Sequence, residues 1–583
     1  MKFTHAAMAL ALSGVLAGLA AQPAAAKEVT IAVASTFTTM DPYDASDTLS
    51  YSAAKSMYEG LFGFDKDMKL HNVLAEGYKV SDDGLVYTVT LKKGIKFHDG
   101  TEFQADAVKA NFDRVTNKAN ALRRYTLYYN IAKTEVVDPY TVRFTLHKPF
   151  SAFINQLAHA SGAMICPSAI QKYPGKELAF HPCGTGPFVL DKYNPSEILH
   201  VVKNPNYWQK GLPKVDGLTF KPVPENSTRV AMLRTGEAHY IFPVPPEQVK
   251  ILEGEKNLVV TKEPSIIERY VAFNMTKKPF DNLKVRQALN YAVNKQALAK
   301  VAFNGLADPT KGIAPKGVEF ADEYGAWPYD PKKARELLKE AGYPNGFSAT
   351  LWSLYNHTTA QKVIQFLQQQ FAQVDVKVSV MAMEAGQRTA YLLKKPEESQ
   401  LNMVYAGWSS STGELDWAIR PLLGTDSWAP VASNFGYYSN KTLDDNFRDA
   451  LLTTDKAKKQ AFYSVAQKAT WDDCPWIYLV TEQNVSAHVK GLTGFYIQPD
   501  AGFEYSQIDL HYHSHSRVWP FMRAARTPAA ADFSKVCRLS FLAPGLLHKF
   551  QGKNEKAGDP ARSSPRDQQS SGSFRSIQTG PNK

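Results

Sequence analysis

The pattern of apolar and polar positions is clearest between residues 75 and 114, where it predicts a strand and then a helix. In residues 85–91 larger apolar side chains occupy alternate positions, the period-2 pattern of a half-buried strand. Asp83-Gly84 before this strand is typical of a hairpin turn, because glycine accepts the positive φ that such turns need. Helical spacing follows in Val108, Phe112 and Val115. The segment offers no nucleophile, metal cage or phosphate-binding loop, so we interpret it as scaffold.

Residues 266–407 alternate between strand-like and helix-like patterns. Strands are expected at 269–275, 351–353, 376–381 and 402–407, and helices at 279–294, 331–341 and 360–374. Asp330 is suited to cap its helix, with Pro331 at the first helical position and Gly342 at the end. The succession of strand, helix and strand between 351 and 381 predicts a parallel pair, and therefore an α/β fold.

The first residues predict export. Lys2 gives a positive start, residues 6–20 are apolar or small, and Ala24-Ala25-Ala26 is a cleavage site of the A-x-A type. We expect a signal peptide at residues 1–26 and a mature chain that begins at Lys27. The apolar run falls short of the ~20 residues that a membrane span needs. The hydrophobic content of 44% is ordinary for a soluble protein, so we expect a soluble periplasmic protein.

The chemistry-bearing residues do not form a catalytic or metal-binding signature. No G-x-S-x-G, H-E-x-x-H or catalytic Cys/His motif is present, and 14 scattered histidines are background for this length. We therefore expect no enzyme, no cofactor and no metal. Cys166 and Cys183 flank one helical stretch, which leaves two interpretations, a disulfide in an oxidising compartment or two small buried residues. Cys474 is interpreted as a packed structural thiol.

The composition changes after Leu510. Residues 511–583 hold 12 Lys and Arg against 4 Asp and Glu, a net +8 of the chain's formal +11. Contact of this basic tail with nucleic acid or anionic lipid is one interpretation, but no sustained periodicity accompanies it. We interpret it as a disordered tail or an out-of-frame readthrough, and we expect no nucleic-acid partner. The three histidines at 511, 513 and 515 lack a fixed surrounding that would hold a metal.

Several stretches together resemble one known family. Residues 75–114 closely resemble the signature of the family 5 extracytoplasmic solute-binding proteins, which deliver peptides, nickel chelates, haem or glutathione to ABC importers. Individually weaker matches are GTGPF at 184–188, VVKNPNYW at 201–208, TRVAMLRTGEA at 228–238, with Gly236 as a natural C-cap, and PFDNLKVRQALNYAVN at 279–294. The resemblance extends over roughly residues 28–510.

The resemblance implies an α/β protein with the type II periplasmic-binding-protein fold, in which two lobes close over a cleft. It also implies three domains, the first of them discontinuous. Domain I is expected at 27–65, 180–265 and 470–510, domain II at 66–179, and domain III at 266–469. The partners implied are a small ligand and the inner-membrane permease subunits of an ABC importer, and we expect a monomer.

The segment from Tyr405 to Trp417 is the best candidate for ligand binding. It follows an expected strand and combines small hydroxyl side chains, which allow close approach of a ligand, with two indoles. A serine-rich surface turn is the structural alternative. The candidate contacts in this segment are Trp408, Ser409, Ser411, Thr412, Glu414 and Asp416.

Comparison with peptide-binding members of the family refines the expected ligand. Those members have Gly-Trp-x-x-Asp here, with the Asp on the peptide ammonium, whereas this chain has Ser411. Dipeptide binders also place an Arg for the carboxylate after the "L-W" strand, and residues 353–359 contain none. Together with Asn356-His357 and Ala385–Arg388, this pattern resembles the glutathione-binding subfamily. A peptide or nickel-chelate binder of the same fold is the alternative, and a secreted hydrolase is the alternative from another class.

A glutathione site needs a cation for the ligand's carboxylates, and arginine binds a carboxylate with two parallel hydrogen bonds. Arg388 and Arg269 are the candidates, and pairing with a structural acid is the alternative for each. Glu414 or Asp416 is expected to bind the ammonium, and Trp408 to form an apolar wall. Further candidate contacts are Asn356, His357, Phe37, Thr38 and Tyr125. A core position is the alternative for Phe37, and the Arg123–Tyr129 stretch either faces an anionic ligand or is a solvated surface.

Overall fold

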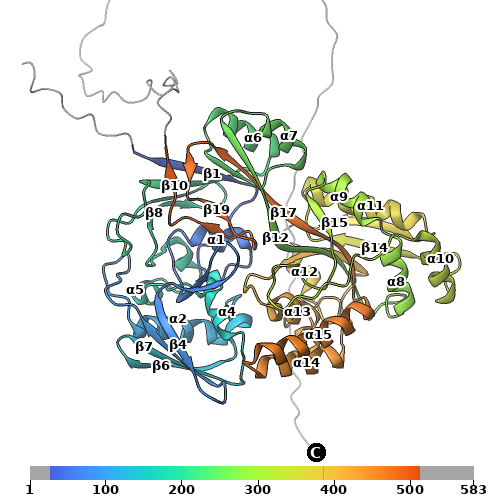
Figure 1. Cartoon of the computed structure of the whole chain (residues 1–583), viewed down its shortest axis with the longest axis horizontal. Coiled ribbons are helices and arrows are strands. Elements are labelled where there is room, and N and C mark those ends of the chain that lie inside the picture. The colour runs from blue at the N-terminus through green and yellow to red at the C-terminus, as the bar shows by residue number, and fades with distance from the viewer. Residues whose placement is uncertain (1–25, 385–386, 512–583) are drawn as a thin grey trace, which may run out of the picture. The chain divides into compact units, whose positions relative to one another are not determined.

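A computed structural model describes residues 26–384 and 387–511 of the chain (Figure 1). The expected signal peptide, apart from Ala26, and the basic tail after His511 lie outside the described residues.

One 11-stranded sheet organises most of the described chain (Figure 1). Its strand order is β15-β14-β16-β12-β17-β11-β1-β10-β9-β8, and β13 also pairs with β17. At its centre β12 (Leu258–Phe273) and β17 (Trp476–Val489) are long antiparallel partners, and their register shifts between Pro264 and Glu268. The other strands are β1 (Glu28–Val33), β8 (Phe188–Asn194), β9 (Ile198–Lys203), β10 (Gly217–Pro222), β11 (Tyr240–Phe242), β13 (Ala307–Pro309), β14 (Ser348–Ser353), β15 (Lys377–Ala382) and β16 (Met403–Ser409).

The part of this sheet formed by residues 266–407 confirms the α/β prediction. β14 pairs in parallel with both β15 and β16, and α11 (Thr358–Ala372) connects β14 to β15. Asp330 caps α10 (Pro331–Glu340) through the amide of Lys333, and Gly342 follows with a φ of 90°, as expected. The expected helix at 279–294 is shorter: α8 spans Leu283–Tyr291, and the Asn282 side chain caps its start by accepting from the Lys284 amide. Gly236 ends α6 (Asn226–Thr235) in the left-handed conformation, as expected.

A separate four-stranded antiparallel sheet contains the strand that the sequence predicts within residues 75–114. Its order is β4 (Ala75–Val80), β5 (Val86–Leu91), β7 (Thr141–Leu146) and β6 (Ile131–Asp138). Alternate residues of β5 are buried, and α2 (Ala105–Thr116) buries Val108, Phe112 and Val115 in the same core. The predicted strand and helix are therefore confirmed, with the strand beginning at Val86 and not at Leu85.

The remaining strands and α-helices have the following bounds. The remaining strands are β2 (Phe62–Phe64), β3 (Leu70–Asn72), β18 (Leu492–Thr493), β19 (Tyr496–Ile497), β20 (Phe503–Glu504) and β21 (Asp509–Leu510). The remaining helices are α1 (Thr48–Ala54), α3 (Tyr125–Tyr128), α4 (Phe153–Ala158), α5 (Pro167–Lys172), α7 (Val249–Glu253), α9 (Lys295–Phe303), α12 (Arg388–Leu392), α13 (Leu415–Leu423), α14 (Lys441–Leu452) and α15 (Lys456–Asp473).

The structure decides between the two interpretations of the cysteine pair. Cys166 and Cys183 form a disulfide, with their Cα atoms 5.4 Å apart. Cys474 is a free and buried thiol at the end of α15, as expected of a structural residue.

Candidate functional site

The loop that follows β16 joins elements that are distant in the sequence. The Ser411 hydroxyl shares a 2.9 Å hydrogen bond with the Tyr51 hydroxyl of α1. The Asn155 amide on α4 donates to the Thr412 carbonyl at 2.8 Å, and the Ser409 hydroxyl donates to the Asp500 carbonyl at 3.2 Å. Ser411 and Thr412 are buried. The predicted binding loop is therefore an internal junction, which argues against a serine-rich surface turn.

Trp408 is held in place by the second indole of the loop. Its ring nitrogen donates to the Trp417 carbonyl at 2.7 Å, and the two ring centroids lie 5.7 Å apart. Trp408 is half-buried, whereas Trp417 is buried. A fixed, half-buried indole is suited to form an apolar wall beside a ligand.

Both acidic residues of the loop already have cationic partners. Glu414 is buried, lies 2.8 Å from the ammonium of Lys459 and accepts a hydrogen bond from the Tyr463 hydroxyl at 2.9 Å. Asp416 is also buried and binds Arg420, one turn along α13, at 2.7 and 2.9 Å. Removing either carboxylate would leave its cation unpaired, and Lys459 is buried while Arg420 is half-buried. The geometry therefore assigns both of these expected ammonium ligands to structural ion pairs.

Of the two candidate arginines, Arg269 is the one that pairs with a structural acid. It forms two hydrogen bonds with the Glu482 carboxylate, at 2.7 and 3.2 Å. Its guanidinium lies across Gly407 so closely that a Cβ at that glycine would come within 2.0 Å of it. Glycine is therefore required at position 407 by the packing of Arg269, and the Arg269 charge is balanced within the chain.

Arg388 differs from Arg269 in having no acidic partner in the part of the chain that the structure describes. Its Nε donates to the Leu354 carbonyl at 2.6 Å, and its two terminal nitrogens donate no hydrogen bond to another described residue. The guanidinium carbons of Arg388 and Arg269 lie 5.3 and 5.0 Å from the centroid of the Tyr355 ring. Arg388 is thus oriented by a carbonyl and an aromatic ring while its charge is available to a ligand carboxylate.

The other residues proposed from the sequence mainly make contacts within the chain. The Asn356 amide donates to Glu384 at 2.8 Å, and His357 Nδ1 accepts from the Ala360 amide, which caps α11. Phe37 is 4% exposed and belongs to the main core. Thr38 bonds to Asp47 and Ser50, and the Tyr125 ring lies beside the Tyr129 ring.

A cavity of ≈ 280 Å³ lies where the Ser411 loop meets α1, the β2–β3 hairpin and residues 496–507. This volume is close to the lower end of the range for small-molecule pockets, about 300 Å³. The lining includes Tyr51, Lys55, Glu59, His159, Ser411 and Asp500. Sequence reasoning proposed only Ser411 of this set, because no motif connects the contributing segments.

The Glu59 carboxylate is a structural centre in this cavity. It accepts hydrogen bonds from the Thr185 hydroxyl, the Tyr207 hydroxyl and the Trp208 ring nitrogen at 2.6 to 2.9 Å. Burial raises the pKa of Glu59 to about 7, and these hydrogen bonds oppose that shift. Glu59 is therefore fully occupied in holding the 185–208 segment against the cavity.

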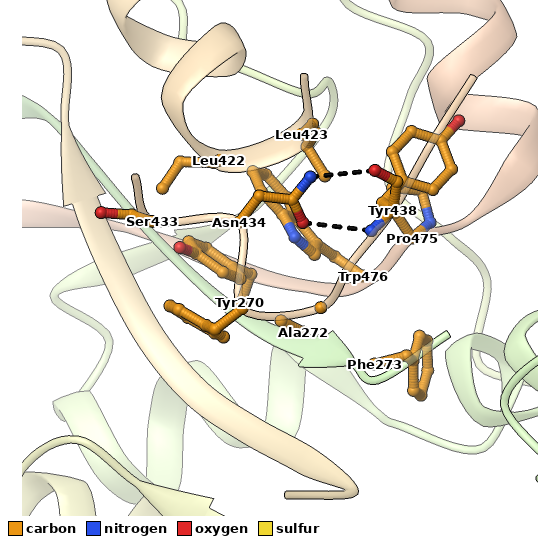
Figure 2. A pocket seen from close by; sticks show the side chains of 12 residues that line it. Tyr270, Ala272, Phe273, Leu422, Leu423, Ser433, Asn434, Tyr438, Pro475 and Trp476 are labelled. Carbon is orange, nitrogen blue, oxygen red and sulfur yellow. Dashed lines mark hydrogen bonds between the residues drawn. The ribbon is translucent and has the colours of Figure 1, made fainter. Parts of the chain in front are cut away.

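A second cavity, shown in Figure 2, is too small to hold a small-molecule ligand. It measures ≈ 10 Å³, room for about one water molecule, and lies beside the stacked rings of Tyr270 and Trp476. Figure 2 also shows the Asn434 side chain bonding both the carbonyl and the amide of Tyr438, at 2.9 and 3.1 Å. These contacts fix the loop before α14, and we interpret this cavity as a packing feature.

In residues 26–384 and 387–511, the single cluster of potential metal ligands is Asp99 with Cys166 and Cys183. Its two sulfur atoms are joined in the disulfide, so it offers no thiolate. Within the same ranges, no helix combines the length and the apolar character needed to cross a bilayer.

The chain belongs to a family of binding proteins. A family model described as Bacterial extracellular solute-binding proteins, family 5 Middle, matches residues 69–430. This membership, together with the α/β sheet, gives the type II periplasmic-binding-protein fold that the sequence predicted. The members of the family bind solutes, in agreement with the expectation that the chain is not an enzyme.

Individual relatives cover most of the chain. It is 58% identical over 507 residues to the glutathione-binding protein GsiB of Escherichia coli O1:K1 / APEC, covering 87% of this chain and 99% of the relative. It is 58% identical over 503 residues to GsiB of Salmonella typhimurium, with coverage of 86% and 98%.

A solved structure supports the same fold. The periplasmic binding protein DppA from Helicobacter pylori, in complex with the peptide STSA, has a TM-score of 0.72 and 28% identity. The similarity covers 82% of this chain and 98% of DppA. NikZ from Campylobacter jejuni, in complex with Ni(L-His), has a TM-score of 0.69 and 25% identity, with coverage of 80% and 95%.

Proposed function

We propose that this protein is the periplasmic glutathione-binding component of an ABC importer, which captures γ-Glu-Cys-Gly and presents it to the inner-membrane permease subunits. The GsiB relatives support this proposal, since their similarity runs through nearly their whole length. The protein is proposed to act as a monomer, to bind its ligand without changing it and to reach the periplasm through the signal peptide at residues 1–26.

The observation that carries the proposal is the arrangement of charge around the Ser411 loop. Position 411 carries a hydroxyl group. Glu414 is ion-paired with Lys459, and Asp416 is ion-paired with Arg420. The loop therefore does not offer the carboxylate that an ordinary α-peptide ammonium would meet there. A ligand whose ammonium is displaced, as the γ-glutamyl linkage displaces it, suits this loop better.

The cationic side of the site suits a ligand with an excess of negative charge. Glutathione has two carboxylates and one ammonium, and Arg388 has a guanidinium without an acidic partner among the described residues. A guanidinium can bind a carboxylate through two parallel hydrogen bonds. A micromolar affinity requires only about 8 kcal/mol, which two such charge-assisted contacts and partial enclosure can supply.

Calorimetry of the mature protein, freed of any bound ligand, tests this proposal. Glutathione is expected to bind measurably and Ala-Ala much more weakly, although Ala-Ala also carries an ammonium and a carboxylate. Equal or tighter binding of Ala-Ala would refute the proposed ligand. Chromatography of the released ligand tests the absence of catalysis, because glutathione is expected to be recovered intact.

A further inference from the structure

The hairpin formed by β19 and β20 places the Asp500 carboxylate at the ≈ 280 Å³ cavity. Its tip, residues 498–502, closes through a 2.7 Å hydrogen bond from the Gln498 amide to the Gly502 carbonyl. Ala501 adopts a φ of +68°, a conformation that costs energy in a residue with a Cβ. A Cβ on Gly502 would lie 2.8 Å from the Asp500 carboxylate. The tip is therefore shaped closely around Asp500.

Asp500 has bonding capacity that the chain does not use. The residue is 6% exposed and lines the cavity. Its Oδ1 accepts a hydrogen bond from the Gly502 amide at 2.8 Å, and Oδ2 has no hydrogen-bond partner among the described residues. A buried carboxylate with a free oxygen is costly unless a cation or donor joins it. Burial also raises the pKa of Asp500, while the nearby charge of Lys55 opposes that change.

The other carboxylates that line the cavity are better satisfied. Glu59 has its three side-chain donors, and Asp65 accepts from the backbone amides of two neighbouring residues. Glu504 accepts from two backbone amides and lies 3.7 Å from the Lys55 ammonium. Lys55 is itself bonded to the Gln498 side chain at 2.9 Å. Asp500 is thus the cavity carboxylate best placed to receive a new cation.

Asp500 also lies beside the loop that follows β16. Its backbone carbonyl accepts the Ser409 hydroxyl, two residues before Ser411, and Ser411 and Tyr51 line the same cavity. We infer that Asp500 binds the α-ammonium of the ligand's γ-glutamyl residue, with Ser411 and Tyr51 as neighbouring hydroxyl groups. This inference rests on the proposed function and names the residue that replaces the carboxylate absent from position 411.

A pair of ligands and a pair of variants test this inference. The probes are glutathione and glutaryl-Cys-Gly, which lacks only the ammonium of glutathione, and the variants are Asp500→Asn and the control Asp67→Asn. Asp67 is exposed, and its substitution makes the same change in formal charge. Calorimetry with the mature wild-type protein is expected to give at least roughly 30-fold tighter binding of glutathione than of glutaryl-Cys-Gly.

The two variants test whether Asp500 causes this difference in affinity between the two probes. Asp500→Asn is expected to weaken glutathione binding by roughly 30-fold or more and to change binding of glutaryl-Cys-Gly by less than about 3-fold. Asp67→Asn is expected to leave both affinities unchanged. Equal weakening of both probes by Asp500→Asn, or unchanged glutathione affinity in this variant, would overturn the assignment.

Failure of the inference is distinguishable from failure of the proposed function. If wild-type protein binds no glutathione, the proposed function is wrong. If it binds glutathione and glutaryl-Cys-Gly equally, the function stands and the ammonium site is wrong. The second result needs no variant, so the inference stays testable even if Asp500→Asn does not fold.

Discussion

Replacing Glu268 by glutamine is expected to stabilise the protein, and to do so increasingly as the pH rises. Glu268 lies on β12, is 4% exposed, and its Oε1 has no hydrogen-bond partner among the described residues. Its surroundings include Ile266, Tyr270, Trp408 and Trp476, none of which can neutralise a carboxylate. Burial therefore raises the pKa of Glu268 well above its ordinary value.

The sign and size of the effect follow from proton linkage. In the unfolded chain a glutamic acid titrates near pH 4.3, so above that pH unfolding releases the proton that the folded protein retains. The free energy of unfolding then falls by about 1.4 kcal/mol per pH unit until the pH reaches the folded pKa. Glutamine has a similar shape and does not ionise. Between pH 5 and pH 7 the stability of Glu268→Gln should therefore rise relative to wild type by up to about 2.7 kcal/mol.

Urea unfolding of both proteins at pH 5, 6 and 7 measures this difference. The control is Glu76→Gln, an exposed residue of β4, whose substitution is expected to change stability by less than about 0.5 kcal/mol. A difference between Glu268→Gln and wild type that does not grow with pH would refute the reasoning. Such a result would mean that the Glu268 carboxylate is ionised in the folded protein and has a partner.

Two further predictions concern the arginine pair and the disulfide. Arg388→Ala should weaken glutathione binding by roughly 2–5 kcal/mol in a normally folded protein. Arg269→Ala should instead cost roughly 3 kcal/mol of stability, because it leaves Glu482 without its partner. Calorimetry measures the affinity of both variants for glutathione, and urea unfolding measures their stability. Unchanged affinity in Arg388→Ala would remove that residue from the site. In unreduced, denatured protein Cys166 and Cys183 should resist alkylation while Cys474 reacts. Reduction should lower stability by roughly 3 kcal/mol, the loop-closure value for a separation of 17 residues, and alkylation of both residues before reduction would contradict the disulfide.

The features that could be predicted from the sequence are those set by neighbouring residues. The period-2 pattern of β5 and the apolar face of α2 depend on spacings within one element, and both are present as expected. The caps at Asp330 and Gly236 likewise depend on bonds to residues within a turn. The helix expected at 279–294 extended too far, because Asn282 satisfies a backbone amide that a longer helix would have needed.

Pairing between distant charges was beyond the reach of sequence reasoning. Glu414 resembles a ligand-binding acid on its loop, but Lys459, 45 residues later, neutralises it. Arg269 and Arg388 look equivalent in the sequence, and only the fold brings Glu482 to one of them. The sequence around Asp500 did not indicate a binding residue. A buried carboxylate with a free oxygen is defined by its surroundings in the fold and not by its neighbours in the chain.

The register shift of β12 explains how the two sides of the proposed ammonium site meet. Just after Pro264, the Ile266 amide donates to the Pro499 carbonyl at 2.9 Å, which holds the tip that carries Asp500. The next residues of β12, 267–269, pair with residues 407–409 at the end of β16 and hold the start of the Ser411 loop. Within four residues, one strand therefore fixes both the hairpin and the loop. A strand bends where a bulge interrupts its pairing, and the register shift of β12 lies between Pro264 and Glu268, at the residues that hold both segments.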